Sequence, residues 1–412
     1  MNRISLLTIG DELLRGRVVN TNATEAALIL RRYGYTLHRV LSVGDTREAI
    51  LDAVESELSR SEIVLTSGGL GPTKDDITKH TLAEWAGGGW VWHQPTLEAL
   101  EQRFAARGRP LNDLTRRQAL VPEACEVVFN LRGTAPGMAF RRAGKLLVSM
   151  PGVPFEMLHM LEHAVVPLLQ GAFPADAFRS FAVRMTDIPE SEAAARMEAL
   201  EPQFPPELSV SYLPRLDGLW IEVSMRHPDP EAAAAGAQRY GQLVAELFAD
   251  KLYTTGDRPL AAELGALLRE RGLTLAAAES MTGGRLSAAL VSVSGASDYY
   301  LGGVTAYAVP VKMAVLGVPE ADIQTHGVVS EAVAKAMAEG VRRALGAQVG
   351  LATTGLAEAD GGQRPQVWIA CAAPDGVQAR RLELYYDRQV NIEYAANYAM
   401  NFCLKVLRGR GE

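Results

Sequence analysis

Short runs of β-branched and leucine residues alternate with amphipathic stretches up to about residue 170. The runs at 4–9, 36–43 and 63–66 predict strands, and the stretches at 24–33 and 47–59 predict helices. Because such alternation is typical of strands joined by helical crossovers, we expect a parallel sheet with helices on both faces. Ligands of these sheets bind beyond the carboxyl ends of the strands. The loops that follow the strands are therefore the first candidates for a binding site.

The rest of the chain falls into two further segments. Between residues 174 and 250, two β runs (180–185 and 219–225) flank a helix near 191–200, and an Ala-rich helix at 231–248 follows. From about residue 253 the α/β alternation returns, with these expected elements: helices 260–271, 284–293 and 331–345, and strands 273–279, 303–309 and 349–353. We therefore expect an α/β protein of three domains, at 1–172, 173–251 and 252–412.

Composition narrows the classes of function. The chain has 48 acidic and 41 basic residues, and this balance disfavours a wide nucleic-acid-binding face. Its three cysteines, Cys125, Cys371 and Cys403, have no Cys-x-x-Cys spacing, which is typical of the reduced cytosol. The apolar run at the N-terminus is too short for a signal peptide, and no apolar run approaches membrane-spanning length. We expect a cytoplasmic protein with no membrane partner.

The loop after the strand at 63–66 has the composition of a nucleotide-phosphate site. Gly68, Gly69 and Gly71 let the backbone turn sharply and approach a ligand, since they have no Cβ. Thr73 adds a hydroxyl and Lys74 a positive charge. The glycines therefore predict a phosphate cradle.

Two carboxylates follow this cradle. Asp75 and Asp76 would repel a bare phosphate, so they predict ligands of a hard divalent cation that bridges to phosphate oxygens. The simpler interpretation is that Asp76 caps the helix that begins near Ile77. Spacing alone leaves both open.

A second candidate site follows the expected strand at 273–279. Ser280 would lie at a strand end before a glycine turn, where backbone N–H groups can stabilise an oxyanion. A serine hydroxyl needs a base, and the one histidine of this segment, His326, is not well placed. Lys312 could act as the base if burial lowers its pKa, and Tyr307 could orient the pair. The alternatives are a helix-capping Ser280, a solvated Lys312 and a half-buried Tyr307.

The loop at 68–78 resembles the Gly-Gly-x-Gly-x-x-x-x-Asp-x-Thr loop of molybdopterin-binding proteins, and specifically that of the CinA family (competence/damage-inducible protein A). Residues 9–14, 20–22, 43–45 and 150–157 resemble further motifs of that family, in the same order. The resemblance implies a three-layer α/β/α molybdopterin-binding-like domain that cleaves the pyrophosphate of ADP-ribose. It also implies a divalent metal (Mg, Mn or Co), with K as a possible second ion. The implied metal ligands are Asp75, Asp76, Glu12 and Glu156, and the implied substrate contacts are Gly68, Gly69, Gly71, Thr73, Asn20 and Asp45.

The C-terminal segment resembles the nicotinamide mononucleotide deamidase domain of CinA proteins. The matching stretches are 279–284 (Glu-Ser-x-Thr-Gly-Gly), 302–307, Lys312, 327–330, 336–340 and 354–355. The resemblance implies that Ser280 attacks the carboxamide carbon, assisted by Tyr307 and Lys312, without a cofactor. The implied substrate contacts are Thr282, Gly283, Gly284, Thr354, Gly355 and Arg388, the last on the substrate phosphate.

Two departures from that family pattern stand near this site. Met281 occupies a position that is usually Cys. The loop at 354–362 lacks a Gly-Pro pair and carries Glu358 and Asp360, which places carboxylates near a phosphorylated substrate. The changed loop favours weaker activity or altered specificity.

The segment at 173–251 is similar to the small α+β, KH-like domain of CinA proteins. It has no Gly-x-x-Gly loop, which a KH domain needs to grip a nucleic-acid backbone, so we expect a linker or a homodimerisation element. The whole chain is interpreted as a bifunctional nucleotide hydrolase that recycles breakdown products of NAD. Two alternatives remain: a molybdopterin-binding or adenylyl-transferring protein, and a non-catalytic nucleotide-binding partner in DNA uptake or repair.

Overall fold

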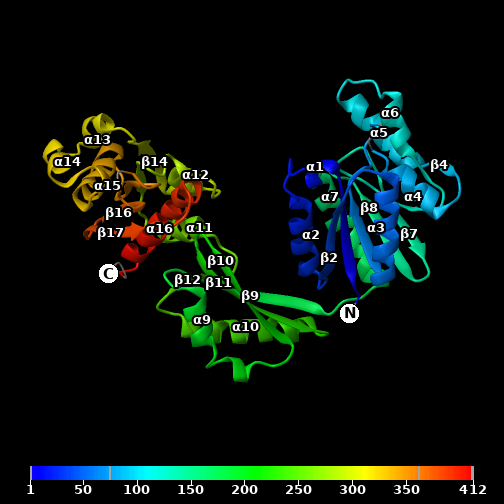
Figure 1. Cartoon of the computed structure of the whole chain (residues 1–412), viewed down its shortest axis with the longest axis horizontal. Coiled ribbons are helices and arrows are strands. Elements are labelled where there is room, and N and C mark those ends of the chain that lie inside the picture. The colour runs from blue at the N-terminus through cyan, green and yellow to red at the C-terminus, as the bar shows by residue number, and fades with distance from the viewer. Residues whose placement is uncertain (1, 74–75, 361, 410–412) are drawn as a thin grey trace. The chain divides into compact units, whose positions relative to one another are not determined.

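The computed structural model describes residues 2–73, 76–360 and 362–409 of the chain (Figure 1). By internal contacts the chain divides into two compact units, residues 1–179 with 225–236, and residues 180–224 with 237–412. Each unit is considered by itself below. The three-domain boundaries expected from the sequence stay a prediction. None of the helices in the described residues is long and apolar enough to cross a membrane.

The N-terminal sheet has six strands in the order β2-β1-β3-β8-β7-β6. Their bounds are β1 Ile4–Ile9, β2 Leu37–Val43, β3 Ile63–Ser67, β6 Glu126–Val128, β7 Gly137–Arg142 and β8 Lys145–Met150. Strands β2, β1, β3 and β8 are parallel, as predicted, but β7 and β6 pair antiparallel. The expected parallel sheet is therefore present, and two antiparallel strands extend it at one edge. Only Ala143 and Gly144 join β7 to β8, both with positive φ, and so short a loop makes a hairpin rather than a crossover.

Helices cover both faces of this sheet. They are α2 Thr21–Arg32, α3 Arg47–Arg60, α4 Thr78–Ala86, α7 Pro154–Met160 and α8 Val166–Ala172, with a π-helical turn at Leu161–Val165 between the last two. Because side chains alternate along a strand, Leu6 packs with α2 and α7 whereas Leu7 packs with α3 and α4. Smaller elements complete the unit: α1 Asp11–Leu14, β4 Trp90–Trp92, α5 Gln94–Ala106, α6 Asp113–Arg116 and β5 Leu120–Pro122. The result is the expected three-layer α/β/α arrangement.

A four-stranded sheet of order β10-β11-β9-β12 follows in the chain. Its elements are β9 Ala177–Met185, α9 Glu190–Met197, β10 Leu208–Arg215, β11 Gly218–His227, α10 Pro230–Leu247 and β12 Leu252–Thr255. The sequence predicted β9, β11 and both helices but missed β10 and β12. This segment is α+β, and its likeness to a KH domain stays a prediction.

The last sheet has the order β14-β13-β15-β16-β17. Its strands are β13 Leu275–Glu279, β14 Tyr300–Thr305, β15 Val349–Leu356, β16 Gln366–Ala373 and β17 Gly376–Glu383, of which the first three run parallel. One face packs on α11 Leu260–Glu270, α12 Arg285–Val291 and α16 Arg388–Leu407, and the other on α13 Val309–Leu316, α14 Glu320–His326 and α15 Glu331–Leu345. The α/β fold expected for this segment is therefore present.

Candidate active sites

A serine and a lysine meet at the carboxyl edge of the C-terminal sheet. Ser280 directly follows β13, and Lys312 lies on α13, which follows the neighbouring parallel strand β14. The Lys312 Nζ lies 2.9 Å from the Ser280 Oγ, 2.5 Å from the Ala306 carbonyl oxygen and 3.2 Å from that of Tyr307. The predicted nucleophile and base are thus in direct contact. Ser280 does not cap α12, whose N-cap is Gly284.

The lysine is completely buried, and burial lowers the pKa of Lys312 to about 8. A neutral amine keeps two N–H donors and one lone pair. Two of its three neighbours are carbonyl oxygens, which only accept, so the lone pair is left to face the hydroxyl of Ser280. This is the geometry that a general base needs.

A buried carboxylate holds the turn that carries the serine. Glu279 is 1% exposed. Its Oε2 accepts from the N–H groups of Gly284 and Leu286, both at 3.0 Å, and its Oε1 accepts from the N–H and hydroxyl of Ser287 at 2.9 and 2.5 Å. Glu279 therefore ties the end of β13 to the start of α12. Glu279 belongs to the matching stretch 279–284, but the sequence analysis predicted no role for it.

The turn leaves particular N–H groups for an oxyanion. The Gly283 N–H donates to the Ser280 carbonyl at 3.1 Å and the Gly284 N–H to Glu279, so both are engaged. In the part of the chain that the structure describes, no hydrogen bond engages the N–H of Met281 or Thr282. Among the N–H groups of this turn, those of residues 281 and 282 are therefore left without a hydrogen-bond acceptor in the described residues. Gly283 and Gly284 instead supply positive φ values of 58° and 100°.

The predicted threonine contacts, Thr282 in this turn and Thr354 at the end of β15, form buried hydrogen bonds. Thr282 Oγ1 and Thr353 Oγ1 are 2.8 Å apart, and Thr354 Oγ1 donates to the Val328 carbonyl at 2.9 Å. All three threonine side chains are buried. A Cβ at Gly355 would stand 2.5 Å from the Met281 sulfur, so the methionine packs where this glycine leaves room. These residues shape the site through packing and buried hydrogen bonds.

Tyr307 and Arg388 form a separate, exposed group. Tyr307 is 63% exposed, and its hydroxyl accepts from Arg388 at 3.3 Å. Arg388 also pairs with Glu358 at 2.8 Å. The hydrogen bond to Tyr307 and the charge of Glu358 raise the pKa of Arg388. Among the described residues no hydrogen bond joins Tyr307 to Ser280; the tyrosine contributes its backbone carbonyl to Lys312 instead.

Most of the residues predicted in the N-terminal part line one cavity of about 410 Å³. From that set, the lining includes Glu12, Asp45, Gly68, Gly69, Gly71, Asp76 and Glu156. Asn20 lies elsewhere: its Oδ1 accepts from the Ala23 N–H at the start of α2, and its Nδ2 donates to Thr8. The loops that follow the parallel strands therefore meet at one cavity, as predicted. Asn20 instead has a structural role at the start of α2.

The glycines of this loop allow close approach of neighbouring segments. A Cβ on Gly68, whose φ is 120°, would stand 2.2 Å from the Ile9 carbonyl oxygen. A Cβ on Gly69, whose φ is 67°, would stand 2.0 Å from the Thr78 hydroxyl oxygen. Side chains at these positions are thus excluded by sterics as well as by backbone conformation.

Asp76 braces the glycine loop. Its Oδ2 accepts from the Thr73 N–H at 3.1 Å and from the Thr73 hydroxyl. Helix α4 begins at Thr78, and its N-cap is Ile77, with no side-chain cap bond. The alternative interpretation of Asp76 as a helix cap was therefore wrong. Asp75, the other expected metal ligand in this loop, lies outside the described residues.

The donor chemistry of the cavity suits a hard divalent cation, since Glu12, Asp76 and Glu156 all offer carboxylate oxygens. Within the ranges that the structure describes, no three Asp, Glu, His or Cys residues gather as a preformed metal site. Glu156 is held by the Asn130 side-chain amide at 2.8 Å. The described carboxylates thus line the cavity separately and do not converge on a single metal position.

Two asparagines in this part were missed as site-building residues. The Asn22 side-chain amide donates to the Ser67 hydroxyl at 3.0 Å and to the Gly152 carbonyl at 2.8 Å, and so joins two loops of the cavity. The Asn130 side-chain amide donates to the Glu156 carboxylate. Asn22 lies within residues 20–22, one of the stretches that resemble the CinA family, and this resemblance could have indicated its role. The sequence around Asn130 gives no such indication.

Comparison with known proteins agrees with this arrangement. Residues 5–171 match the model of a probable molybdopterin binding domain, and residues 257–407 match that of the CinA C-terminal domain. A CinA-like protein of Salinibacter ruber is 38% identical over 98% of this chain and 99% of its own length. A CinA-like protein of Gemmatimonas aurantiaca is 40% identical, covering 95% of this chain and 93% of its own. A crystal structure of CinA from Thermoplasma acidophilum is 34% identical and covers 39% of this chain and 94% of its own, with a TM-score of 0.36.

The fold and the two sites define an α/β protein that combines a molybdopterin-binding-like N-terminal part with a C-terminal part carrying a buried Ser–Lys pair. The relatives match almost the full length of the chain, in both parts. The chain belongs to the CinA family.

Proposed function

We propose that the C-terminal part is an amidohydrolase that converts nicotinamide mononucleotide and water to nicotinate mononucleotide and ammonia. The observation that carries this proposal is the contact between Ser280 and a buried Lys312 whose pKa is lowered to about 8. The substrate is taken from the resemblance of the motifs to the deamidase domain.

In the proposed reaction, the Ser280 Oγ attacks the carboxamide carbon as its proton passes to the Lys312 Nζ. The oxyanion that forms accepts hydrogen bonds from the N–H groups of Met281 and Thr282. Lys312 then returns the proton to the leaving nitrogen, and ammonia departs. Water, deprotonated by the neutral lysine, attacks the acyl-enzyme and releases nicotinate mononucleotide with Ser280 restored.

Ammonia release from nicotinamide mononucleotide tests this proposal directly. We expect Ser280→Ala and Lys312→Met each to lower kcat by at least about a thousandfold. Ser292→Ala and Lys335→Met are matched controls, because both residues are outside the site, Ser292 just after α12 and Lys335 on α15. Equal rates from wild type and Ser280→Ala would refute the mechanism.

We also propose that the N-terminal cavity hydrolyses the pyrophosphate of ADP-ribose. The support is the cavity of about 410 Å³, lined by the glycine loop and by Glu12, Asp76 and Glu156. These carboxylates would hold a divalent metal, which would neutralise charge on the phosphate oxygens. The two activities together would return products of NAD breakdown to use.

Two rival functions give different results in the same preparations. A molybdopterin-binding protein would carry pterin after purification, and its fluorescence would reveal it. A non-catalytic nucleotide-binding partner would bind both nucleotides and turn over neither. Homodimerisation and a cytoplasmic location remain part of the proposal, and light scattering of the purified chain tests the first.

A further inference from the structure

A cavity of about 290 Å³ lies in the unit of residues 180–224 and 237–412, apart from the Ser280 site. Its lining comes from the loop after β9, the turn before β12, strand β17 and the C-terminal half of α16. The lining residues that carry the argument are Asp187, Lys251, Arg380, Asn401, Lys405 and Arg408. The volume is near the lower end of small-molecule pockets, which start at about 300 Å³.

Positive charge dominates the lining. Lys251, Arg380, Lys405 and Arg408 contribute four cations, against the carboxylates of Asp187 and Asp250. The chain as a whole has a formal net charge of −7, so this excess of cations runs against the overall balance. A cleft lined mostly by charges of one sign concentrates ions of the opposite sign, here anions.

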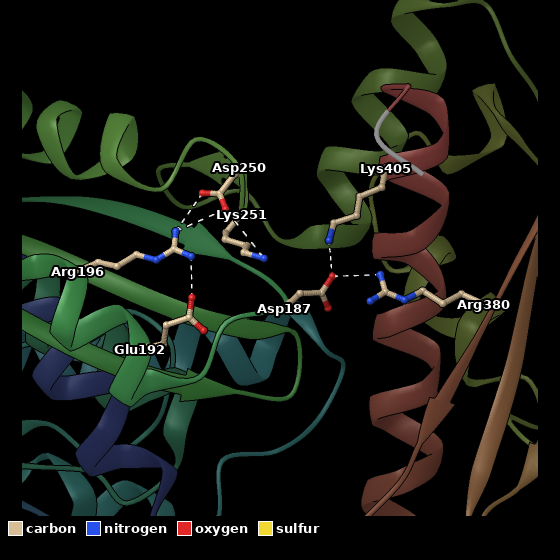
Figure 2. A network of polar contacts seen from close by, with 7 residues as sticks. All are labelled: Asp187, Glu192, Arg196, Asp250, Lys251, Arg380 and Lys405. Carbon is tan, nitrogen blue, oxygen red and sulfur yellow. Dashed lines mark hydrogen bonds and ion pairs between the residues drawn. The ribbon is translucent and has the colours of Figure 1, made fainter. Parts of the chain in front are cut away.

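The two carboxylates do not neutralise these cations one by one. Asp187 Oδ2 is shared between Lys405 and Arg380, the latter at 3.5 Å (Figure 2). Asp250 is 3.3 Å from Arg196, a residue outside the lining, and only reaches Lys251 at 4.0 Å (Figure 2). Arg380 and Lys405 therefore share a single negative charge, and Lys251 has a distant one.

A buried asparagine is among the residues that line the same cavity. Asn401 is 2% exposed, and its Oδ1 is one of the buried polar atoms of the described residues that have no hydrogen-bond partner. A buried acceptor without a donor costs stability. A ligand that supplies an O–H or N–H donor at this point would remove that cost.

Helix stability accounts for only part of this arrangement. Lys405 and Arg408 stand at the C-terminal end of α16, where cations stabilise the helix dipole. Arg408 also has partners within the protein, since its guanidinium donates to the Tyr253 carbonyl and to Glu263, both at 2.8 Å. Neither reason applies to Arg380 on β17, which shares Asp187 and lies over the Tyr398 ring, or to the Asn401 Oδ1, which has no hydrogen-bond partner among the described residues. These two residues, with Lys405, point to a ligand.

We propose that this cavity binds a small phosphorylated compound that also carries a hydroxyl group. The phosphate takes Arg380 and Lys405 as partners, in competition with Asp187, and the hydroxyl donates to the Asn401 Oδ1. The site shares no lining residue with the Ser280 group, so its occupation does not depend on the proposed amidohydrolase activity.

Calorimetric titration of the full chain with ribose 5-phosphate tests this site. We expect saturable binding that weakens at least tenfold in Arg380→Gln and in Asn401→Leu. Asp187→Asn should bind several times more tightly, because it removes the competing charge; Asn tolerates the positive φ of 57° at this position. A site of purely structural importance would not give opposite changes in affinity from neighbouring variants.

Controls separate this cavity from other anion sites. Arg343→Gln removes an exposed arginine of α15 that lines neither site, and it should bind as wild type does. Inorganic phosphate should bind wild type more weakly than ribose 5-phosphate does. To Asn401→Leu, which cannot accept a hydrogen bond from the ribose hydroxyl, the two probes should bind with equal affinity. Arg380→Gln, on an exposed strand, decides the matter if Asn401→Leu does not fold. The proposal is overturned by absent binding to wild type, by unchanged binding in Arg380→Gln, by loss in Arg343→Gln, or by equal wild-type affinities for the two probes.

Discussion

The Nζ of Lys312 lies 2.9 Å from the Oγ of Ser280, although 32 residues separate them in the sequence. The contact follows from topology, because β13 and β14 are parallel neighbours and their carboxyl ends lie at the same edge of the sheet. Burial of the lysine then provides what the pair needs chemically, an amine that loses its proton near neutral pH. Fold and reactivity are therefore linked at this one contact.

Deamidation should follow the ionisation of Lys312. The base must be neutral, and its pKa is about 8, so the neutral fraction rises tenfold per pH unit below 8 and levels above it. We expect kcat/KM for ammonia release to rise with this slope from pH 6 and to reach a plateau near pH 9. A profile that is flat or falling through pH 8 would contradict a lysine base.

Stability should depend on the same group. The pKa of Lys312 is lowered from 10.5 in the unfolded chain to about 8 in the folded protein, so the unfolded state binds more protons between these values. The cost of burying the charged lysine is complete below pH 8 and is relieved as pH rises through this window. Urea unfolding at pH 7.5, 8.5 and 9.5 should show wild type gaining stability relative to Lys312→Met. Parallel curves for the two proteins would argue against the lowered pKa.

The sequence predicted the part of this site that depends on strand order and residue type. Ser280 and its glycine turn follow a strand, and Lys312 was the available base; both arguments need only local pattern. The direction of Tyr307 was not predictable, because an exposed side chain in a loop has no periodicity that fixes where it points. Its hydroxyl meets Arg388 through a contact between residues 81 positions apart.

The N-terminal part shows the same limit. Gly68, Asp45 and Glu12 were placed at one cavity by the rule for parallel strands. The antiparallel pair β7–β8 was missed because it depends on positive φ at Ala143, a conformation that alanine rarely adopts and that no sequence rule indicates. Contacts made by long-range partners, such as Asn130 with Glu156, are likewise invisible to local pattern.

Glu279→Gln should destabilise the serine turn. Each carboxylate oxygen accepts two hydrogen bonds, and an amide nitrogen in place of either one would face two donors. We expect a loss of about 2 kcal/mol or more in the free energy of unfolding, together with a lower kcat. Glu393→Gln, an exposed partner of Arg285 at 3.6 Å, is the matched control and should change stability by less than about 0.5 kcal/mol. Equal urea midpoints for the two variants would refute this role.

Glu358→Gln should improve use of a phosphorylated substrate. Glu358 pairs with Arg388 at 2.8 Å and so competes with a substrate phosphate for it. Because both side chains are exposed, we expect KM for nicotinamide mononucleotide to fall only about threefold to fivefold, with kcat unchanged. Nicotinamide riboside, which lacks the phosphate, should show no change, and neither should Glu383→Gln on β17. A KM that falls equally for both substrates would show that Glu358 does not act on the phosphate.

Hydrolysis of ADP-ribose should depend on the carboxylates of the N-terminal cavity and on a metal. Glu12 and Glu156 line that cavity, and the Glu156 carboxylate accepts a hydrogen bond from the uncharged Asn130 amide, so these carboxylates can still hold a cation. We expect Glu12→Gln and Glu156→Gln each to lower turnover by at least about a hundredfold, and EDTA to stop it until Mg²⁺, Mn²⁺ or Co²⁺ is restored.

The matched control for this prediction is Glu162→Gln, because Glu162 follows α7 closely in the chain yet pairs with Arg32 at 3.1 Å instead of lining the cavity. Ser280→Ala should also keep full activity toward ADP-ribose, since its site belongs to the other compact unit. Full turnover by Glu156→Gln, or turnover that EDTA leaves unchanged, would remove the carboxylates from the mechanism. In that case the glycine loop would serve binding alone, and the Ser280–Lys312 pair would be the one hydrolytic centre proposed for the chain.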